Sequence, residues 1–130
     1  MASRGVVNRL GIVTDKEYEY AGNDFEDASE LVGVGSNHSL PDYSHTPNRI
    51  YVKTDANGFR EMRVYGEDGK VKLEIGYHPE RNLDSSGCRV LHYHEYDENL
   101  DRSLAKLMTR EIYEKYKKYL NHWKVFYEKK

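Results

Sequence analysis

Apolar and polar side chains alternate through the middle of the chain, which is the pattern of β-strands that bury one face. The alternation is clearest in VKLEIGYH, residues 71–78, and it also runs through RIYVKTD, FREMRVYG and CRVLHYHEYD. An Asn-Gly pair at 57–58 and an Asp-Gly pair at 68–69 separate these runs, and both pairs favour tight hairpin turns. We therefore predict a four-stranded antiparallel meander over residues 49–97.

The end of the chain changes to a spacing of three and four residues, which predicts a helix with one apolar face. The residues on this face are Ile112, Tyr116, Tyr119, Leu120 and Trp123. Thr109 suits the N-cap position, and the helix dipole favours Glu111 in the first turn. We expect an amphipathic helix over residues 109–127 that packs on one face of the meander, which makes the fold class α+β.

The first 48 residues are loop-rich, because Gly, Ser, Asn, Asp and Pro recur in them. One short helix is predicted at residues 24–32, where Asn23 or Asp24 can cap its start and Gly33 can end it. Residues 49–130 then form a single domain, since a chain of 130 residues has the length to bury one core.

Charge is distributed unevenly along the chain, although the net charge is only −2. Residues 1–48 carry a net charge of −5 and residues 109–130 carry +4. The basic end of the chain can bind a phosphate group or an acidic partner. Equally, the two ends can be solvated surfaces of opposite charge that attract each other. Charge alone therefore does not select a partner.

Composition and motifs exclude several classes of protein. The chain has no run of roughly 20 apolar residues, so no membrane partner is expected. Its single cysteine, Cys88, has no partner for an internal disulfide, which favours a reducing, cytoplasmic compartment. The phosphate-binding loop, the dinucleotide glycine fingerprint and the HExxH zinc motif are absent, so no cofactor is predicted.

Three histidines lie on neighbouring strands of the predicted meander. His92 and His94 are two residues apart, so their side chains point the same way at a spacing of about 6.6 Å. His78 ends the preceding strand, which the loop PERNLDSSG joins to the strand of His92. The three imidazoles approach one another if the strand register puts His78 on the same face. Otherwise they are exposed strand residues without a shared site.

Such a group of histidines suits two kinds of chemistry. Neutral and protonated imidazoles can act as base and acid in phosphodiester cleavage, with an arginine against the phosphate. Imidazoles also bind divalent metal ions, with further ligands from neighbouring strands or loops. The candidate arginines are Arg63, Arg81 and Arg89, the candidate metal ligands are His78, His92 and His94, and the carboxylates near them are Glu80, Glu95 and Asp97.

Substrate or partner contacts are predicted beside the meander, because a loop rooted in a rigid sheet often carries binding residues. The candidates are Tyr43, Ser44, His45 and Arg49 before the first strand, and Tyr93 and Glu95 beside the two later histidines. The segment before the first strand equally suits a turn that side-chain hydrogen bonds from Asp42, Ser44 and Thr46 stabilise.

The runs LPDYSHTPNRIYVK, NGFREMRVYGEDGKVKLEIGYHPE and LHYHEYD together resemble small domains at the C-termini of phage head-morphogenesis proteins and bacterial polymorphic toxins. In those domains a hairpin with an Asp-Gly type turn precedes a strand with a His-x-His motif. They are thought to be similar to the barnase, EndoU, colicin and RelE group of nucleases. Over residues 39–120 the resemblance implies a compact fold of helix and antiparallel sheet, and metal-independent RNA cleavage carried by His78, His92 and His94.

We consider three functions. The first is a phage or mobile-element protein that cleaves RNA without a metal, with His92 or His94 as base, His78 as acid and Arg63 or Arg81 against the phosphate charge. The second is a non-enzymatic, phage-encoded inhibitor of a host defence protein, similar to an anti-CRISPR protein. Its acidic residues 15–30 and its tyrosines would replace nucleic acid in the host protein's binding channel. The third is a metal-dependent hydrolase built on the His-x-His strand.

Overall fold

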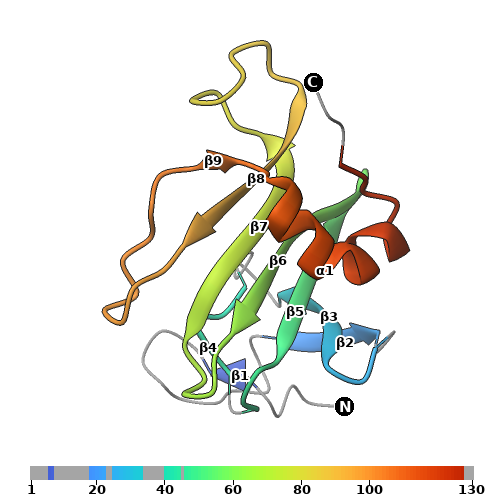
Figure 1. Ribbon diagram of the computed structural model, residues 1–130. Coiled ribbons are helices and arrows are strands. Elements are labelled where there is room, and N and C mark those ends of the chain that lie inside the picture. Colours follow the sequence, from blue (N-terminus) through green and yellow to red (C-terminus); the bar gives the residue numbers. More distant parts are fainter. Residues whose placement is uncertain (1–5, 8–17, 23–24, 34–39, 45, 128–130) are drawn as a thin grey trace.

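The computed structural model describes residues 6–7, 18–22, 25–33, 40–44 and 46–127. Within these residues the chain forms a large mixed sheet, a small pair of strands and a helix (Figure 1). The large sheet has the strand order β2-β3-β5-β6-β7-β8-β9, and the small pair consists of β1 and β4. The strands are Val6–Val7 (β1), Tyr18–Gly22 (β2), Ala28–Gly33 (β3), Tyr43–Ser44 (β4), Ile50–Asp55 (β5), Gly58–Tyr65 (β6), Val71–Pro79 (β7), Arg89–Glu95 (β8) and Lys106–Leu107 (β9).

The four strands from β5 to β8 form the predicted antiparallel meander, in which each strand pairs with the next. The Asn-Gly and Asp-Gly pairs make the turns at the expected places. Gly58 and Gly69 have φ angles of 99° and 82°, a conformation that glycine adopts without the steric cost of a Cβ atom. This part of the fold prediction is confirmed, because it depends on local turn chemistry.

The sheet is larger than the predicted four-stranded antiparallel sheet, and it is mixed. β3 pairs with β5 in parallel, and β9 adds a short antiparallel strand beside β8. The predicted helix over residues 24–32 is wrong, because Ala28–Gly33 forms β3. Ala28 and Leu31 are buried in this strand, and its pairing with β5 outweighs the local capping signal. The predicted boundary after residue 48 therefore does not separate the sheet from the earlier residues.

Helix α1 spans Arg110–His122, within the predicted range. The Thr109 hydroxyl caps it as predicted, because it accepts a hydrogen bond from the backbone N–H of Ile112 at 3.2 Å. The buried side chains of the helix are those of Tyr113, Tyr119 and Leu120. Within the described ranges, no helix is long and apolar enough to cross a membrane.

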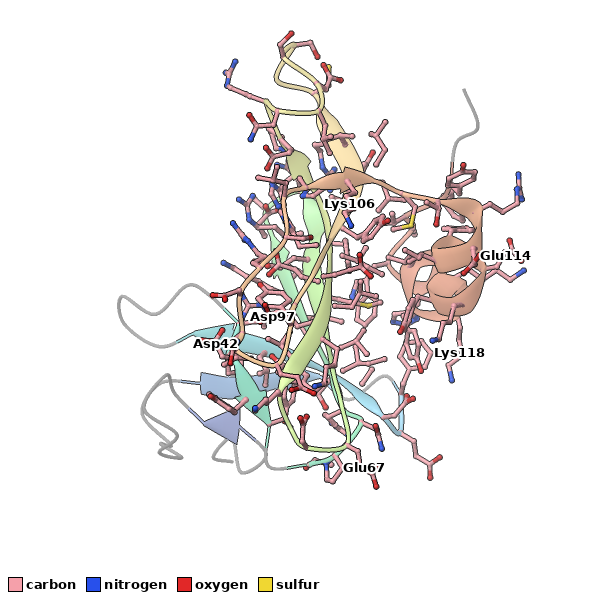
Figure 2. All side chains as sticks on the ribbon, turned by 60° about the vertical axis from the view of Figure 1, so that its left-hand side comes forward. Asp42, Glu67, Asp97, Lys106, Glu114 and Lys118 are labelled. Atoms are coloured by element: carbon pink, nitrogen blue, oxygen red, sulfur yellow. The ribbon has the colours of Figure 1, made fainter. Side chains whose placement is uncertain are left out.

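The two faces of the sheet differ in character. Helix α1 covers one face, where its buried residues pack with Met62 and Ile75 in the main core. Figure 2 shows the helix on one side of the sheet and Asp42 and Asp97 on the other. That other face holds a smaller apolar cluster and several buried polar side chains. The cluster consists of Leu31, Leu40, Tyr51, Tyr65 and Val71, and the buried polar side chains include Arg63, Glu74, His92 and His94.

Candidate functional site

The register between β7 and β8 places the three histidines on the face opposite α1. Gly76 lies opposite His92, and His78 lies opposite Val90. Residues opposite each other in a sheet share a face, as do residues two apart in one strand, so His78 shares the face of His92 and His94. The ring centroids of His78 and His92 are 4.7 Å apart, and those of His92 and His94 are 5.5 Å apart. We call these three residues the histidine cluster.

Gly76 makes room for the histidine cluster. A Cβ atom on Gly76 would lie 2.8 Å from Nε2 of His92 and 3.0 Å from Nε2 of His78, both shorter than ordinary contacts. The imidazole nitrogens therefore converge over a backbone position that only glycine leaves open. A glycine inside an alternating strand marks such a close approach, so the sequence carries a signal for this feature.

Backbone carbonyls fix the orientation of all three rings. The Nδ1–H of His92 donates to the carbonyl of Val90 at 2.8 Å, and that of His94 donates to the carbonyl of Ser103 at 2.9 Å. His78 makes the same kind of bond to the carbonyl of Pro79 at 3.0 Å. A carbonyl oxygen only accepts hydrogen bonds, so in the neutral form of each ring we assign the proton to Nδ1 and a lone pair to Nε2.

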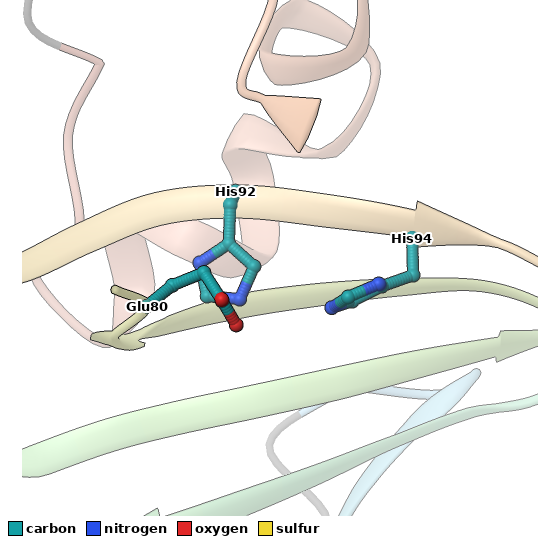
Figure 3. Close-up of side chains that lie close together, drawn as sticks. All are labelled: Glu80, His92 and His94. Carbon is teal, nitrogen blue, oxygen red and sulfur yellow. The ribbon is translucent and has the colours of Figure 1, made fainter. Parts of the chain in front are cut away.

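Glu80 brings a carboxylate to the histidine cluster. One potential ligand atom from each of Glu80, His92 and His94 lies within 4.8 Å of the other two. Figure 3 shows the carboxylate beside the His92 ring, with the ring of His94 pointing toward it. One Glu80 oxygen also accepts a hydrogen bond from the backbone N–H of Asn82 at 3.3 Å, which restrains the carboxylate.

His92 is the most buried member of the histidine cluster. Its side chain is 0% exposed, and its Nε2 atom is buried with no hydrogen-bond partner among the described residues. Burial lowers the pKa of His92 below its ordinary value, and the neighbouring rings of His78 and His94 lower it further. His92 is therefore neutral at pH 7, with an available lone pair in a buried position.

Arg63, an expected phosphate-binding residue, lies on the same face but makes other contacts. Its Nε–H donates to Glu74 at 2.9 Å, and Nη1 donates to Asp42 at 2.9 Å and to the carbonyl of Leu40 at 2.8 Å. Burial would raise the pKa of Glu74, but the charge and hydrogen bond of Arg63 lower it below its ordinary value. The guanidinium of Arg63 thus holds the segment of Leu40 and Asp42 against the sheet.

The other two candidate arginines lie near the ends of β7 and β8. Arg89 donates to the carbonyl of Phe59 at 2.9 Å, and its guanidinium lies 4.2 Å from the centroid of the Tyr77 ring. Arg81 is exposed in the loop after β7, directly after Glu80, and donates to the carbonyl of Ser85 at 3.4 Å. Of the three candidate arginines, Arg81 is therefore the exposed one, and it follows Glu80 directly in the sequence.

The candidate binding residues before β5 make contacts within the fold. The Ser44 hydroxyl donates to the carbonyl of Thr46 at 3.0 Å and shares a hydrogen bond with the Tyr51 hydroxyl at 3.1 Å. Arg49 donates to the carbonyl of Glu26 at 2.6 Å. Tyr43 lies in β4, which pairs with β1. The bond from Ser44 to Thr46 agrees with the expected turn, whereas His45 lies outside the described residues.

Tyr93 and Glu95 do not point toward the histidine cluster. Tyr93 packs against the core beneath α1, and Glu95 is exposed and pairs with Lys106 at 2.9 Å. Asp97, another candidate ligand, accepts hydrogen bonds from the backbone N–H groups of Asn99 and Asp101. Of the three candidate carboxylates, Glu80 is the one that joins the histidines. Most of the acidic stretch at residues 15–30 lies outside the residues whose side chains the structure describes.

Comparisons with protein-family models, with curated proteins and with solved structures find no match to this chain. The geometry of the site therefore supplies the evidence on its function.

Proposed function

We propose that the protein is a hydrolase of the nuclease type, which cleaves phosphodiester bonds in RNA at the histidine cluster. The observation that carries this proposal is the convergence of three imidazoles over Gly76, each with Nδ1 held by a backbone carbonyl. Imidazole is the side chain best suited to proton transfer at neutral pH, and a fixed tautomer keeps Nε2 ready for that transfer.

The reaction needs one group that accepts a proton and one that donates a proton. The acceptor takes the proton of the ribose 2′-hydroxyl, whose oxygen attacks the adjacent phosphorus, and the donor protonates the departing 5′-oxygen. A protonated His78 suits the donor role because His78 is less buried than His92 and His94. His92 and His94 are the candidate acceptors, since the Nε2 atom of each neutral ring carries a lone pair and His92 is neutral.

The reaction also needs positive charge against the phosphate oxygens. Arg63 already pairs with Glu74 and Asp42, so its charge is balanced within the protein. Arg81 is the candidate for this contact, because it is exposed in the loop after β7. Arginine pairs well with phosphate because its planar guanidinium donates two parallel hydrogen bonds.

The test is the cleavage of a labelled RNA oligonucleotide by the full chain, with added zinc and separately in EDTA. We expect cleavage in at least one condition, and a loss of about 10²- to 10⁴-fold in rate for His78→Ala, the range for removal of an acid or base. His122→Ala is the matched control, because His122 is an exposed histidine on α1, across the sheet from the cluster. Intact RNA in both conditions, or equal rates for the two variants, would contradict the proposal.

A further inference from the structure

We infer that Glu80, His92 and His94 bind a divalent transition-metal ion of the zinc class. The binding itself does not depend on RNA as substrate, and the inference rests on the proposed function only for the part that the ion plays in hydrolysis. The metal site expected from sequence consisted of His78, His92 and His94, so the structure puts Glu80 in the place of His78.

The first observation is the buried Nε2 atom of His92. It has no hydrogen-bond partner among the described residues, and His92 is 0% exposed. Buried polar atoms in proteins almost always have a partner, because their desolvation otherwise goes uncompensated. A metal ion is a fitting partner here, since Glu80, His92 and His94 each offer one ligand atom and these atoms lie within 4.8 Å of one another.

The second observation is the way both imidazoles are anchored. Histidines that bind a metal through Nε2 usually donate the opposite N–H to a carbonyl or a carboxylate, which fixes the ring and makes Nε2 a better ligand. His92 and His94 do this through the carbonyls of Val90 and Ser103. The backbone of Glu80 is restrained as well, because its carbonyl accepts hydrogen bonds from the N–H groups of Leu83 and Asp84.

The third observation is that Glu74, the other carboxylate near the histidine cluster, already has hydrogen-bond and ion-pair partners. Glu74 lies opposite His94 in the strand register, but its Oε1 atom accepts hydrogen bonds from Arg63 and from the Tyr96 hydroxyl. Its Oε2 atom lies 3.6 Å from Arg102. Glu80 makes no ion pair among the described residues, so its charge can balance that of a cation.

The donor set indicates the class of ion. Two imidazole nitrogens and one carboxylate oxygen suit zinc and similar transition metals, whereas magnesium and calcium prefer oxygen ligands alone. Ligand atoms on a tetrahedral zinc ion, at 2.0 to 2.1 Å from the metal, are about 3.3 Å apart. Binding therefore requires the trio to close from within 4.8 Å to about 3.3 Å, and Glu80, which is half-buried at the start of a loop, is placed to move toward the two imidazoles.

Three protein ligands leave one position of a tetrahedral ion for water or substrate, as in catalytic zinc sites. The ion would supply the positive charge that Arg63 cannot provide. With the ion bound, His92 and His94 would serve as ligands in place of the acceptor role proposed for them above, and His78, whose ring lies 4.7 Å from that of His92, would remain as the imidazole for proton transfer.

The test is zinc binding to the full chain, measured by calorimetric titration after treatment with EDTA and dialysis. We expect one zinc ion per chain and a loss of affinity of at least tenfold for His92→Ala and for Glu80→Gln. Because His92 is buried and its removal can impair folding, Glu80→Gln is the decisive variant: its side chain keeps its size and loses only the charge. Glu95→Gln and His122→Ala are the matched controls, and they should bind zinc like the parent chain.

Nitrogen NMR of the imidazole rings gives a second measurement, because zinc shifts the resonance of a ring nitrogen only if that nitrogen binds the ion. Zinc should shift the Nε2 resonances of His92 and His94 and leave those of His122 in place.

The inference is overturned if the chain binds no zinc, or if Glu80→Gln and its control Glu95→Gln bind equally well. RNA cleavage in EDTA by a chain that binds no zinc would overturn the inference and leave the proposed function standing. Zinc binding without RNA cleavage would support the inference and contradict the proposed function.

Discussion

Replacing Gly76 with alanine disturbs the histidine cluster without removing any of its side chains. The added Cβ atom would lie 2.8 Å from Nε2 and 2.9 Å from Cε1 of His92. Favourable contacts between non-bonded heavy atoms begin near 3.5 Å, so the ring has to move by about 0.7 Å. His92 is 0% exposed, so the ring has no solvent into which it can move.

The expected effect on stability combines two opposing contributions. Overpacking a buried site costs about 1 to 3 kcal/mol. Replacing a glycine inside a strand by alanine gains about 0.5 to 1 kcal/mol, because glycine loses more backbone freedom on folding. The free energy of unfolding should therefore fall by about 0 to 2.5 kcal/mol. Zinc affinity should fall at least tenfold, because metal–ligand distances tolerate changes of only about 0.2 Å.

Urea denaturation and calorimetric zinc titration of Gly76→Ala measure the two effects. Gly66→Ala is the matched control, since a Cβ atom there would lie 2.6 Å from Cε of Lys72, near the end of a flexible side chain that can move aside. The control should keep the zinc affinity of the parent chain. If Gly76→Ala also binds zinc as tightly as the parent chain, the imidazoles do not need the space above Gly76, and the geometric reasoning is refuted.

Three further outcomes are expected. Glu74→Leu should lower the free energy of unfolding in urea by about 3 kcal/mol, the lower end of the range for a broken buried ion pair, since Arg63 keeps its contact with Asp42; an unchanged urea midpoint would contradict this. Burial and the hydrogen bond to Asp27 raise the pKa of Tyr119 to about 12 from 10.0, so the unfolded chain loses this proton first and stability should fall as pH rises from 10 to 12. Tyr119→Phe should remove that part of the alkaline fall in thermal melts, and an identical fall in both proteins would argue against the assignment. Zinc at a hundred times its dissociation constant should raise the free energy of unfolding by about 2.7 kcal/mol, and a melting temperature that does not respond to zinc would speak against a site in the folded chain.

Much of the architecture is readable from residues that lie close together in the chain. The turns at Gly58 and Gly69, the period-two strands between them and the N-cap at Thr109 all depend on interactions within a few residues. The alternation also puts His92 and His94 on one face, as predicted. The helix expected at residues 24–32 shows the limit of such reasoning, since the competing partner of that segment is β5, about 20 residues later.

The site depends on pairings that no local pattern contains. The register of β7 against β8 puts His78 on the face of His92, and a shift by one residue would turn it to the opposite face. The guanidinium of Arg63, for which the sequence alone predicted a contact with phosphate, instead donates hydrogen bonds to the carbonyl of Leu40 and to Asp42.

By itself the sequence determined the meander, the helix with its cap and the shared face of His92 and His94, because short-range sterics and side-chain periodicity specify these features. Only the tertiary structure decided the strands added to the meander, the position of the His78 ring over Gly76 and the approach of Glu80 to the imidazoles. The physical reason is that register and long-range packing are set by the burial of the whole sheet, which joins residues that are far apart along the chain.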